Sequence, residues 1–124
     1  MNIKSSALWI GIVILVVGIV GFIPALVPDG LVLGIFQVDP FHNIVHVLTG
    51  ALAIFAAKSS DKAAKMYFQV FGVVYALVTV LGFTTGTGLL GLIPVNGADN
   101  FLHLAIAAVY LYFGFGTKAG AVKA

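Results

Sequence analysis

The sequence contains no cysteine, no arginine and no glutamate among its 124 residues. Without cysteine, the chain forms no disulfide, holds no iron–sulfur cluster, attaches no c-type haem covalently and offers no thiolate nucleophile. Without arginine, it lacks the side chain best suited to bidentate phosphate recognition. A serine–histidine–aspartate pattern, a phosphate-binding loop and a dinucleotide-binding fingerprint are also missing. We therefore expect a protein that is not an enzyme.

Charge is also scarce. Only 8% of the residues are charged and 61% are hydrophobic, whereas a soluble domain carries about 25% charged residues. Because so few charges cannot cover a water-facing surface, lipid must surround much of this protein. The length suits one domain, so we expect a single four-helix transmembrane domain over residues 1–124 whose main partner is the lipid bilayer.

The lysines are confined to the ends of the apolar runs. They are Lys4, Lys58, Lys62, Lys65, Lys118 and Lys123. They form no stripe and have no interleaved aromatic residues, which argues against nucleic acid as a partner. All six fall on one side of the predicted membrane, whereas the opposite loops contain Asp29, Asp39 and Asp99. The positive-inside rule therefore predicts a multi-pass protein of the cell membrane with cytoplasmic N- and C-termini.

Four apolar runs predict an all-α membrane protein of four transmembrane helices. They cover residues 7–27, 41–57, 61–83 and 98–116. About 20 helical residues cross a hydrocarbon core of about 30 Å. Ser5 and Ser6 are possible caps of the first helix, and Asp39 and Asn96 of the second and fourth, with Pro40 at the first helical position. The first run is too long for a signal peptide and no clean cleavage site follows it, so we expect it to remain as a span.

The two halves of the chain resemble each other, with repeat one at about 5–57 and repeat two at about 61–116. Residues pair 57 positions apart at Gly34 and Gly91, Asn43 and Asn100, and His46 and His103, and 61 positions apart at Gly21 and Gly82. Each half is a helix pair, so both halves insert with the same orientation. This pattern predicts two parallel helix-pair repeats, forming a bundle, related by a pseudo-two-fold axis along the membrane normal.

The repeat is clearest in a polar element at the start of the second and fourth helices. Its residues are His42, Asn43 and His46 in the first half and Asp99, Asn100, Leu102 and His103 in the second. With these elements, H-N-x-x-H and D-N-x-L-H, nearly the whole chain resembles the small four-pass bacterial integral membrane proteins grouped as domain of unknown function 4383. The resemblance implies the four-helix fold and implies no activity.

Polar residues inside a membrane helix are costly and call for an explanation. One interpretation is structural, with Asp99 placed at a helix N-terminus by capping and by the helix dipole. Asn43 and Asn100 would then tie the outer loops to helix ends, and His46 and His103 would form hydrogen bonds across the helix interface. This interpretation describes a non-enzymatic, structural or partner-binding membrane protein.

A second interpretation is a metal site. His42 with His46, and Asp99 with His103, are two pairs at the i, i+4 spacing, which places both side chains of a pair on one helix face. Three imidazoles and one carboxylate suit zinc, copper or iron. His42 and Asp99 lie nearer the water interface than the other two residues, so the site requires them to reach inward.

Further alternatives use the same residues. Asn43 and Asn100 would form hydrogen bonds to the metal-ligating side chains and so orient them. A haem held between His46 and His103 is another alternative, because two helices related by symmetry can supply two axial ligands. Tyr110 lies two turns further along the same helix face than His103, so a pathway for protons or for a quinone is a further alternative.

These interpretations make different demands on the structure. A metal or haem site requires His46 and His103 to face each other, whereas a structural role holds even if each histidine bonds separately. The glycine faces of the helices also allow homo-oligomerisation, and another membrane protein is an alternative partner. The sequence thus predicts a structural or partner-binding protein, with metal or haem binding as the alternative.

Overall fold

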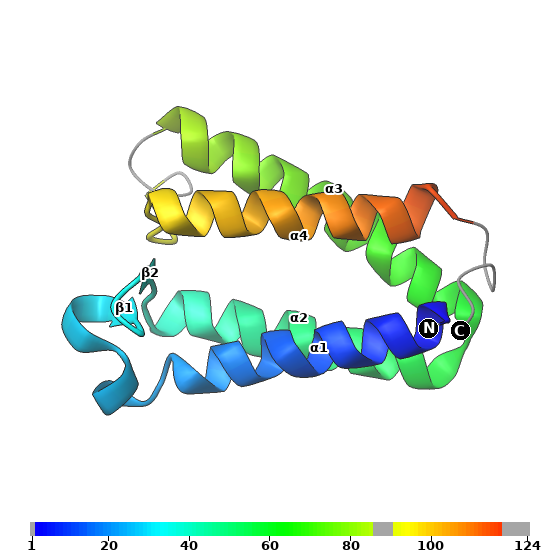
Figure 1. Cartoon of the computed structure of the whole chain (residues 1–124), viewed down its shortest axis with the longest axis horizontal. Helices are drawn as coiled ribbons and strands as arrows, with labels where there is room; N and C mark the ends of the chain where they lie inside the picture. The colour runs from blue at the N-terminus through cyan, green and yellow to red at the C-terminus, as the bar shows by residue number, and fades with distance from the viewer. Residues whose placement is uncertain (1, 86–90, 118–124) are drawn as a thin grey trace.

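Four long helices make up most of the chain (Figure 1). They are α1 (Ile3–Val20), α2 (Pro40–Ser59), α3 (Asp61–Thr85) and α4 (Gly97–Phe115). The structure, a computed structural model, describes residues 2–85 and 91–117. By length and composition all four helices can cross a membrane. The predicted all-α fold of four membrane-spanning helices is therefore confirmed. Residues 86–90, in the threonine- and glycine-rich segment after Phe83, lie outside the described residues.

The start of α1 differs from the prediction. The cap is Asn2, whose side-chain oxygen accepts a hydrogen bond from the Ser5 N–H at 2.8 Å. Ser5 and Ser6 lie inside the helix instead, so their prediction as caps was wrong. The helix begins earlier because Ile3 and Ala7 are both fully buried, and an additional helical turn places the Ile3 side chain in the core.

The end of α1 also differs from the prediction. The apolar run continues to residue 27, but α1 ends at Val20 and two 3-10 turns follow, η1 (Pro24–Leu26) and η2 (Pro28–Gly30). Proline has no N–H to donate and disfavours helix at the residue before it. Pro24 and Pro28 therefore keep this apolar segment out of the helix, which is 18 residues long.

A small antiparallel hairpin lies at the end of the bundle where α2 and α4 begin, here called the outer end. β1 (Leu31–Val32) pairs with β2 (Phe36–Gln37), with Leu31 opposite Gln37. The Asn96 side chain donates to the Ile35 carbonyl oxygen at 2.9 Å. This bond ties the hairpin, which the sequence did not predict, to the start of α4.

The helices pack as two hairpins, α1 against α2 and α3 against α4 (Figure 1). Small residues allow the backbones to approach closely. A Cβ atom on Gly50 would lie 2.5 Å from the Leu15 nitrogen, and one on Gly114 would lie 2.8 Å from the Gln69 nitrogen. These glycine faces are thus occupied inside each hairpin, and a homo-oligomer, which stays a prediction, would need another surface.

The caps of α2 and α4 are equivalent. The Asp39 Oδ1 atom accepts a hydrogen bond from the His42 N–H at 2.8 Å, and the Asn96 Oδ1 atom accepts one from the Asp99 N–H at 2.9 Å. Pro40 occupies the first helical position of α2. Both predicted caps and the predicted proline position are confirmed.

Gly34 and Gly91 also adopt the same conformation. Their φ angles are 74° and 75°, in the left-handed region that favours glycine. Each of the two glycines precedes a helix cap by five positions. Recurrence at paired positions supports the internal repeat, whose pseudo-two-fold axis stays a prediction.

Replacing the α4 cap should destabilise the protein. Asn96→Ala should lower the free energy of unfolding by about 2 kcal/mol, because it removes the cap and the hydrogen bond to the hairpin. Asn2→Ala removes one cap hydrogen bond from α1 and should cost about 1 kcal/mol. Denaturant titration in detergent, followed by circular dichroism, measures both losses. Equal losses would show that the bond from Asn96 to the hairpin contributes nothing.

Candidate metal centre

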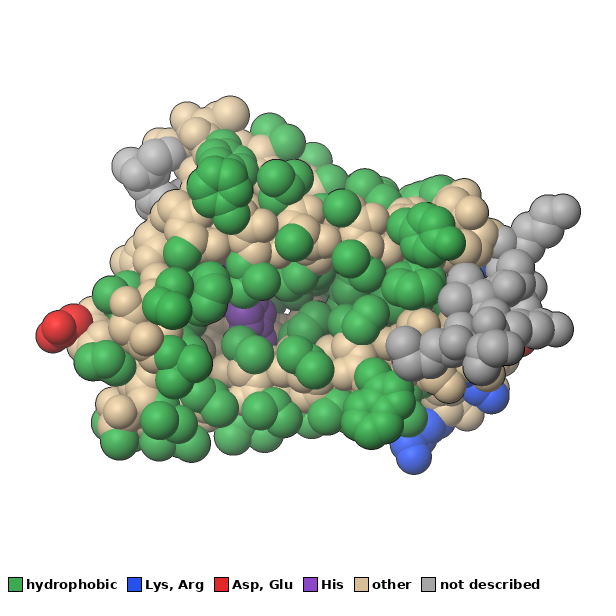
Figure 2. Space-filling view, in the orientation of Figure 1, with side chains coloured by type: hydrophobic (Ala, Val, Ile, Leu, Met, Phe, Trp, Pro, Cys, Tyr) green, Lys and Arg blue, Asp and Glu red, His purple; other side chains and the backbone are tan. Residues whose placement is uncertain are grey.

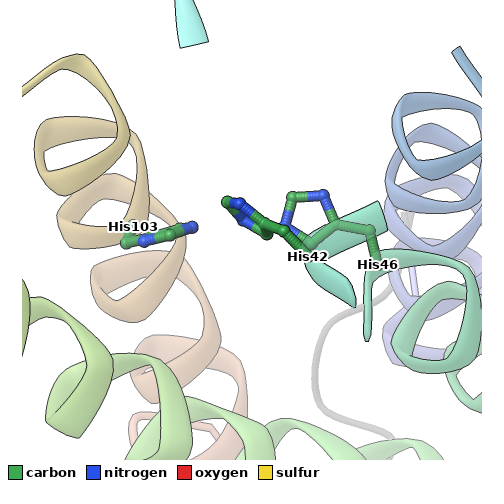
Figure 3. A group of neighbouring side chains, drawn as sticks. All are labelled: His42, His46 and His103. Atoms are coloured by element: carbon green, nitrogen blue, oxygen red, sulfur yellow. The ribbon is translucent and has the colours of Figure 1, made fainter. Parts of the chain in front are cut away.

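Three histidine side chains from both hairpins meet inside the bundle near its outer end (Figure 3). His42 and His46 come from α2, and His103 comes from α4. The ring centroids are 4.6 Å apart for His42 and His46, 5.9 Å for His42 and His103, and 6.3 Å for His46 and His103. Each ring offers one nitrogen, and these nitrogens all lie within 4.8 Å of one another. The side chains are 2%, 8% and 3% exposed, so this group, the histidine cluster, is buried.

The helix caps place these side chains. Asp39 sets the start of α2, so His42 lies in the first turn and His46 lies one turn further along the same face. Asn96 sets the start of α4 in the same way for His103. His46 and His103 each follow their cap by seven residues, which is about 10 Å along a helix. The two helices therefore bring these histidines to the same depth.

Asp99 does not belong to the cluster. Its Oδ2 atom accepts a hydrogen bond from the Asn96 N–H at 2.9 Å, while its own N–H donates to the Asn96 side chain. These reciprocal bonds form a capping box. The carboxylate is thus held at the helix end, as the structural interpretation predicted. Asp99 as a fourth metal ligand stays a prediction, and the group of histidines that could hold an ion does not include it.

Asn43 and Asn100 each join the two helices of a hairpin, and their predicted role in orienting the metal ligands stays a prediction. The Asn43 Nδ2 group donates to the Gly21 carbonyl oxygen at 2.8 Å, and the Asn100 Nδ2 group donates to the Gly82 carbonyl oxygen at 3.2 Å. Each bond joins the start of one helix to the preceding helix. Gly21 pairs with Gly82 and Asn43 with Asn100 in the predicted repeat, so the same contact occurs in both halves.

The histidine cluster has unused nitrogen atoms. The Nδ1 atom of each of its three rings has no hydrogen-bond partner within the described part of the chain. Leaving a buried polar atom unpaired costs about 1–3 kcal/mol, and three such atoms in one place call for an explanation. The structural interpretation predicted hydrogen bonds from His46 and His103 across the helix interface, and their Nδ1 atoms make none.

A cavity of about 60 Å³ lies beside the cluster. All three histidines line it, together with Thr49 of α2 and Tyr75 of α3. On this measure, a single water needs about 10–15 Å³. The cavity therefore has room for an ion and water ligands beside the three histidine rings.

Buried tyrosines continue inward from the cluster. The Tyr75 ring lies 5.7 Å from the His103 ring and 5.4 Å from the Tyr110 ring, between centroids. The Tyr110 hydroxyl is 3.0 Å from the Tyr67 hydroxyl, which donates to the Thr49 carbonyl oxygen. Of this group, only Tyr110 was assigned a functional alternative from the sequence. The spacing of Tyr67 and Tyr75 on one face of α3 was the available signal.

Comparison with known proteins places the chain in a family. The family model described as Domain of unknown function (DUF4383) matches residues 4–116. The matched range contains the histidine cluster and both capping elements, and it covers far more than half of the chain. No curated protein and no solved structure matches the chain. As its two polar elements indicated, the chain belongs to the family Domain of unknown function (DUF4383).

Proposed function

We propose that this protein binds one transition metal ion through His42, His46 and His103. The observation that carries this function is the set of three buried imidazoles whose Nδ1 atoms have no partner among the described residues. Neutral imidazole is the commonest protein ligand for metals. One nitrogen from each of the three rings could bind a single ion, because these nitrogens all lie within 4.8 Å of one another.

Zinc, copper and iron all suit this ligand set. Imidazole ligands favour zinc, copper, iron and nickel, whereas carboxylates favour magnesium, calcium and manganese. Zinc sites with three protein ligands keep a fourth position for water or another ligand. Zinc–nitrogen distances are about 2.0–2.1 Å, so an ion would draw the three rings closer together than they lie now.

A single ion fits the cluster better than haem does. Haem between His46 and His103 would need room for a macrocycle between the two rings. The His42 ring lies 4.6 Å from one of them and 5.9 Å from the other, in the space that the macrocycle would fill. Figure 3 shows the His42 ring between the rings of His46 and His103.

Metal analysis of protein purified without a histidine tag tests this function. The protein is stripped with a chelator, equilibrated with zinc or copper in detergent, freed of unbound metal and analysed for its metal content and absorbance spectrum. We expect about one ion per chain, lost in His46→Ala and in His103→Ala. Wild-type protein without metal after loading, or variants that hold as much as wild type, would leave the histidines as packing residues. A Soret band in the absorbance spectrum would show that the histidines bind haem and not a metal ion.

A second proposal concerns the orientation of the protein in the membrane. We propose that it is a multi-pass protein of the cell membrane with both termini in the cytoplasm. Support comes from the lysines, because those described flank the start of α1 and the connection from α2 to α3. Figure 2 shows lysine side chains at one end of the bundle and an acidic side chain at the other. Positive charge marks the cytoplasmic side of membrane proteins.

Cysteine labelling tests this orientation, because the chain contains no cysteine of its own. Leu92 lies in the connection before α4 and Ser59 at the end of α2, and both are exposed. In intact cells, a membrane-impermeant maleimide should label Leu92→Cys and spare Ser59→Cys. After permeabilisation it should label both. The reverse pattern would invert the topology.

A further inference from the structure

A pocket lies at the inner end of the bundle, which is the end opposite β1 and β2, where α1 begins and α2 ends. It has a volume of about 270 Å³. Its lining residues come from both ends of this helix pair and are Asn2, Lys4, Ser5, Leu8, Ala57 and Lys58. Figure 2 shows lysine side chains at this end of the molecule. Lysines from two different helices therefore line one pocket.

Both lysines are available to a ligand. Within the described part of the chain, neither Lys4 nor Lys58 makes a hydrogen bond or an ion pair, whereas Lys65 donates to the Thr117 carbonyl oxygen. None of the described lining residues is acidic, and Asp61, at the start of α3, is not among them. The pocket therefore holds positive charge that no side chain of the described residues neutralises, and it fits an anion.

The position of Lys4 also favours an anion. Lys4 lies in the first turn of α1, and that turn contains no acidic residue. The partial positive charge of a helix N-terminus disfavours a cation there and favours an anion. Lys4 therefore does not stabilise its own helix, and a bound anion would offset the unfavourable interaction between its ammonium group and the helix dipole.

The pocket crosses the boundary between water and lipid. Both α1 and α2 can span a membrane, and the pocket lies where one begins and the other ends. Leu8 follows Lys4 by one helical turn, which is about 6 Å toward the apolar zone, and Ala57 precedes Lys58. A soluble anion would contact only the lysines, whereas a phospholipid would place its phosphate beside them and an acyl chain against Leu8.

We propose that this pocket binds an anionic phospholipid. Its phosphate lies between Lys4 and Lys58, which bind phosphate as point charges, and an acyl chain lies along α1 over Leu8. A zwitterionic phospholipid carries an ammonium group of its own, which the two lysines repel, so the pocket selects a head of net negative charge. The site shares no residue with the histidine cluster and does not depend on metal binding. In the proposed topology it faces the cytoplasmic leaflet, whose lipids carry negative charge.

The single tryptophan provides the probe. Trp9 follows Leu8 in α1, is 59% exposed and is the only tryptophan in the chain, so bromine on a neighbouring acyl chain would quench its fluorescence. The protein is reconstituted in phosphatidylcholine vesicles with a rising fraction of brominated phosphatidylglycerol or, as the matched lipid, of brominated phosphatidylcholine. Lys4→Gln and Lys58→Gln each remove one charge from the pocket. Lys62→Gln is the control variant, because Lys62 is exposed at the same end and does not line the pocket.

We expect wild-type protein to prefer phosphatidylglycerol by about tenfold or more, because each lysine near the membrane surface contributes about fivefold. Lys4→Gln and Lys58→Gln should each reduce this preference by about fivefold, and Lys62→Gln should leave it within about twofold. Equal quenching by both lipids in wild type, or an equal reduction in all three variants, would overturn the proposed site. Inorganic phosphate, added in place of chloride at equal ionic strength, should not displace phosphatidylglycerol; displacement would show that the pocket takes a soluble anion and would contradict a lipid ligand.

Discussion

Saturating zinc should stabilise this protein, because the ion would connect its two helix hairpins. His42 and His46 belong to the α1–α2 hairpin and His103 to the α3–α4 hairpin. Between the hairpins, the main described helix contacts are those of α3 with α2 and α1, so coordination would strengthen the connection between α2 and α4, where the histidine rings now approach one another. Zinc at one hundred times its dissociation constant should raise the free energy of unfolding by about 2.7 kcal/mol.

Variants of the cluster should abolish this stabilisation. Denaturant titration in detergent, with and without zinc, measures it for His42→Ala, His46→Ala and His103→Ala. The matched control is Thr79→Val, which removes a buried hydroxyl that donates to the Tyr75 carbonyl oxygen within α3. Thr79→Val should keep the zinc effect. A zinc effect that survives in all three histidine variants would place the ion elsewhere.

Adding a methyl group at Gly21 or at Gly82 should be severely destabilising. A Cβ atom at Gly21 would lie 1.9 Å from the Asn43 Oδ1 atom, and one at Gly82 would lie 2.0 Å from the Asn100 Oδ1 atom. The amide could escape only by rotating away from the carbonyl oxygen that it binds. Overpacking and a lost buried hydrogen bond together should cost about 3 kcal/mol or more.

A control and a rescue make this result specific. Gly97→Ala adds a methyl group where, apart from its chain neighbours and the backbone of its own helix, no atom of the described residues lies within 4 Å, so its free energy of unfolding should change by less than about 1 kcal/mol. The double variant Gly21→Ala with Asn43→Ala removes the clashing amide and should be more stable than Gly21→Ala alone. If Gly21→Ala is as stable as Gly97→Ala, the contact between Gly21 and Asn43 does not hold the hairpin together.

Local signals in the sequence were sufficient for the helices and their caps. Asp39 and Asn96 cap the helices as expected, because the side-chain-to-backbone bond of a cap spans only three residues. The predicted C-terminal end of the first helix was wrong. Apolar residues continue past Val20, but Pro24 prevents the helix from continuing with them. Hydropathy indicates which residues can face lipid, whereas proline and burial determine where the helix ends.

The candidate site was only partly predictable. The shared depth of His46 and His103 follows from the repeat, because equal distances from equivalent caps give equal depths. The inward position of His42 depends on how the two hairpins pack, which no local pattern encodes. Asp99 satisfies both the spacing of a chelating pair and that of a capping box, and a bond to its own helix end costs less chain entropy than a site shared between helices.

X-ray absorption at the zinc edge of tag-free, zinc-loaded protein tests the central claim most directly. Three imidazole ligands predict nitrogen scatterers at about 2.0–2.1 Å, with the outer-shell scattering of three imidazole rings per zinc. Replacing one cluster histidine by alanine should reduce that number to two or remove the ion. A spectrum of oxygen ligands without imidazole scattering, or one unchanged in His103→Ala, would contradict a metal site in the histidine cluster.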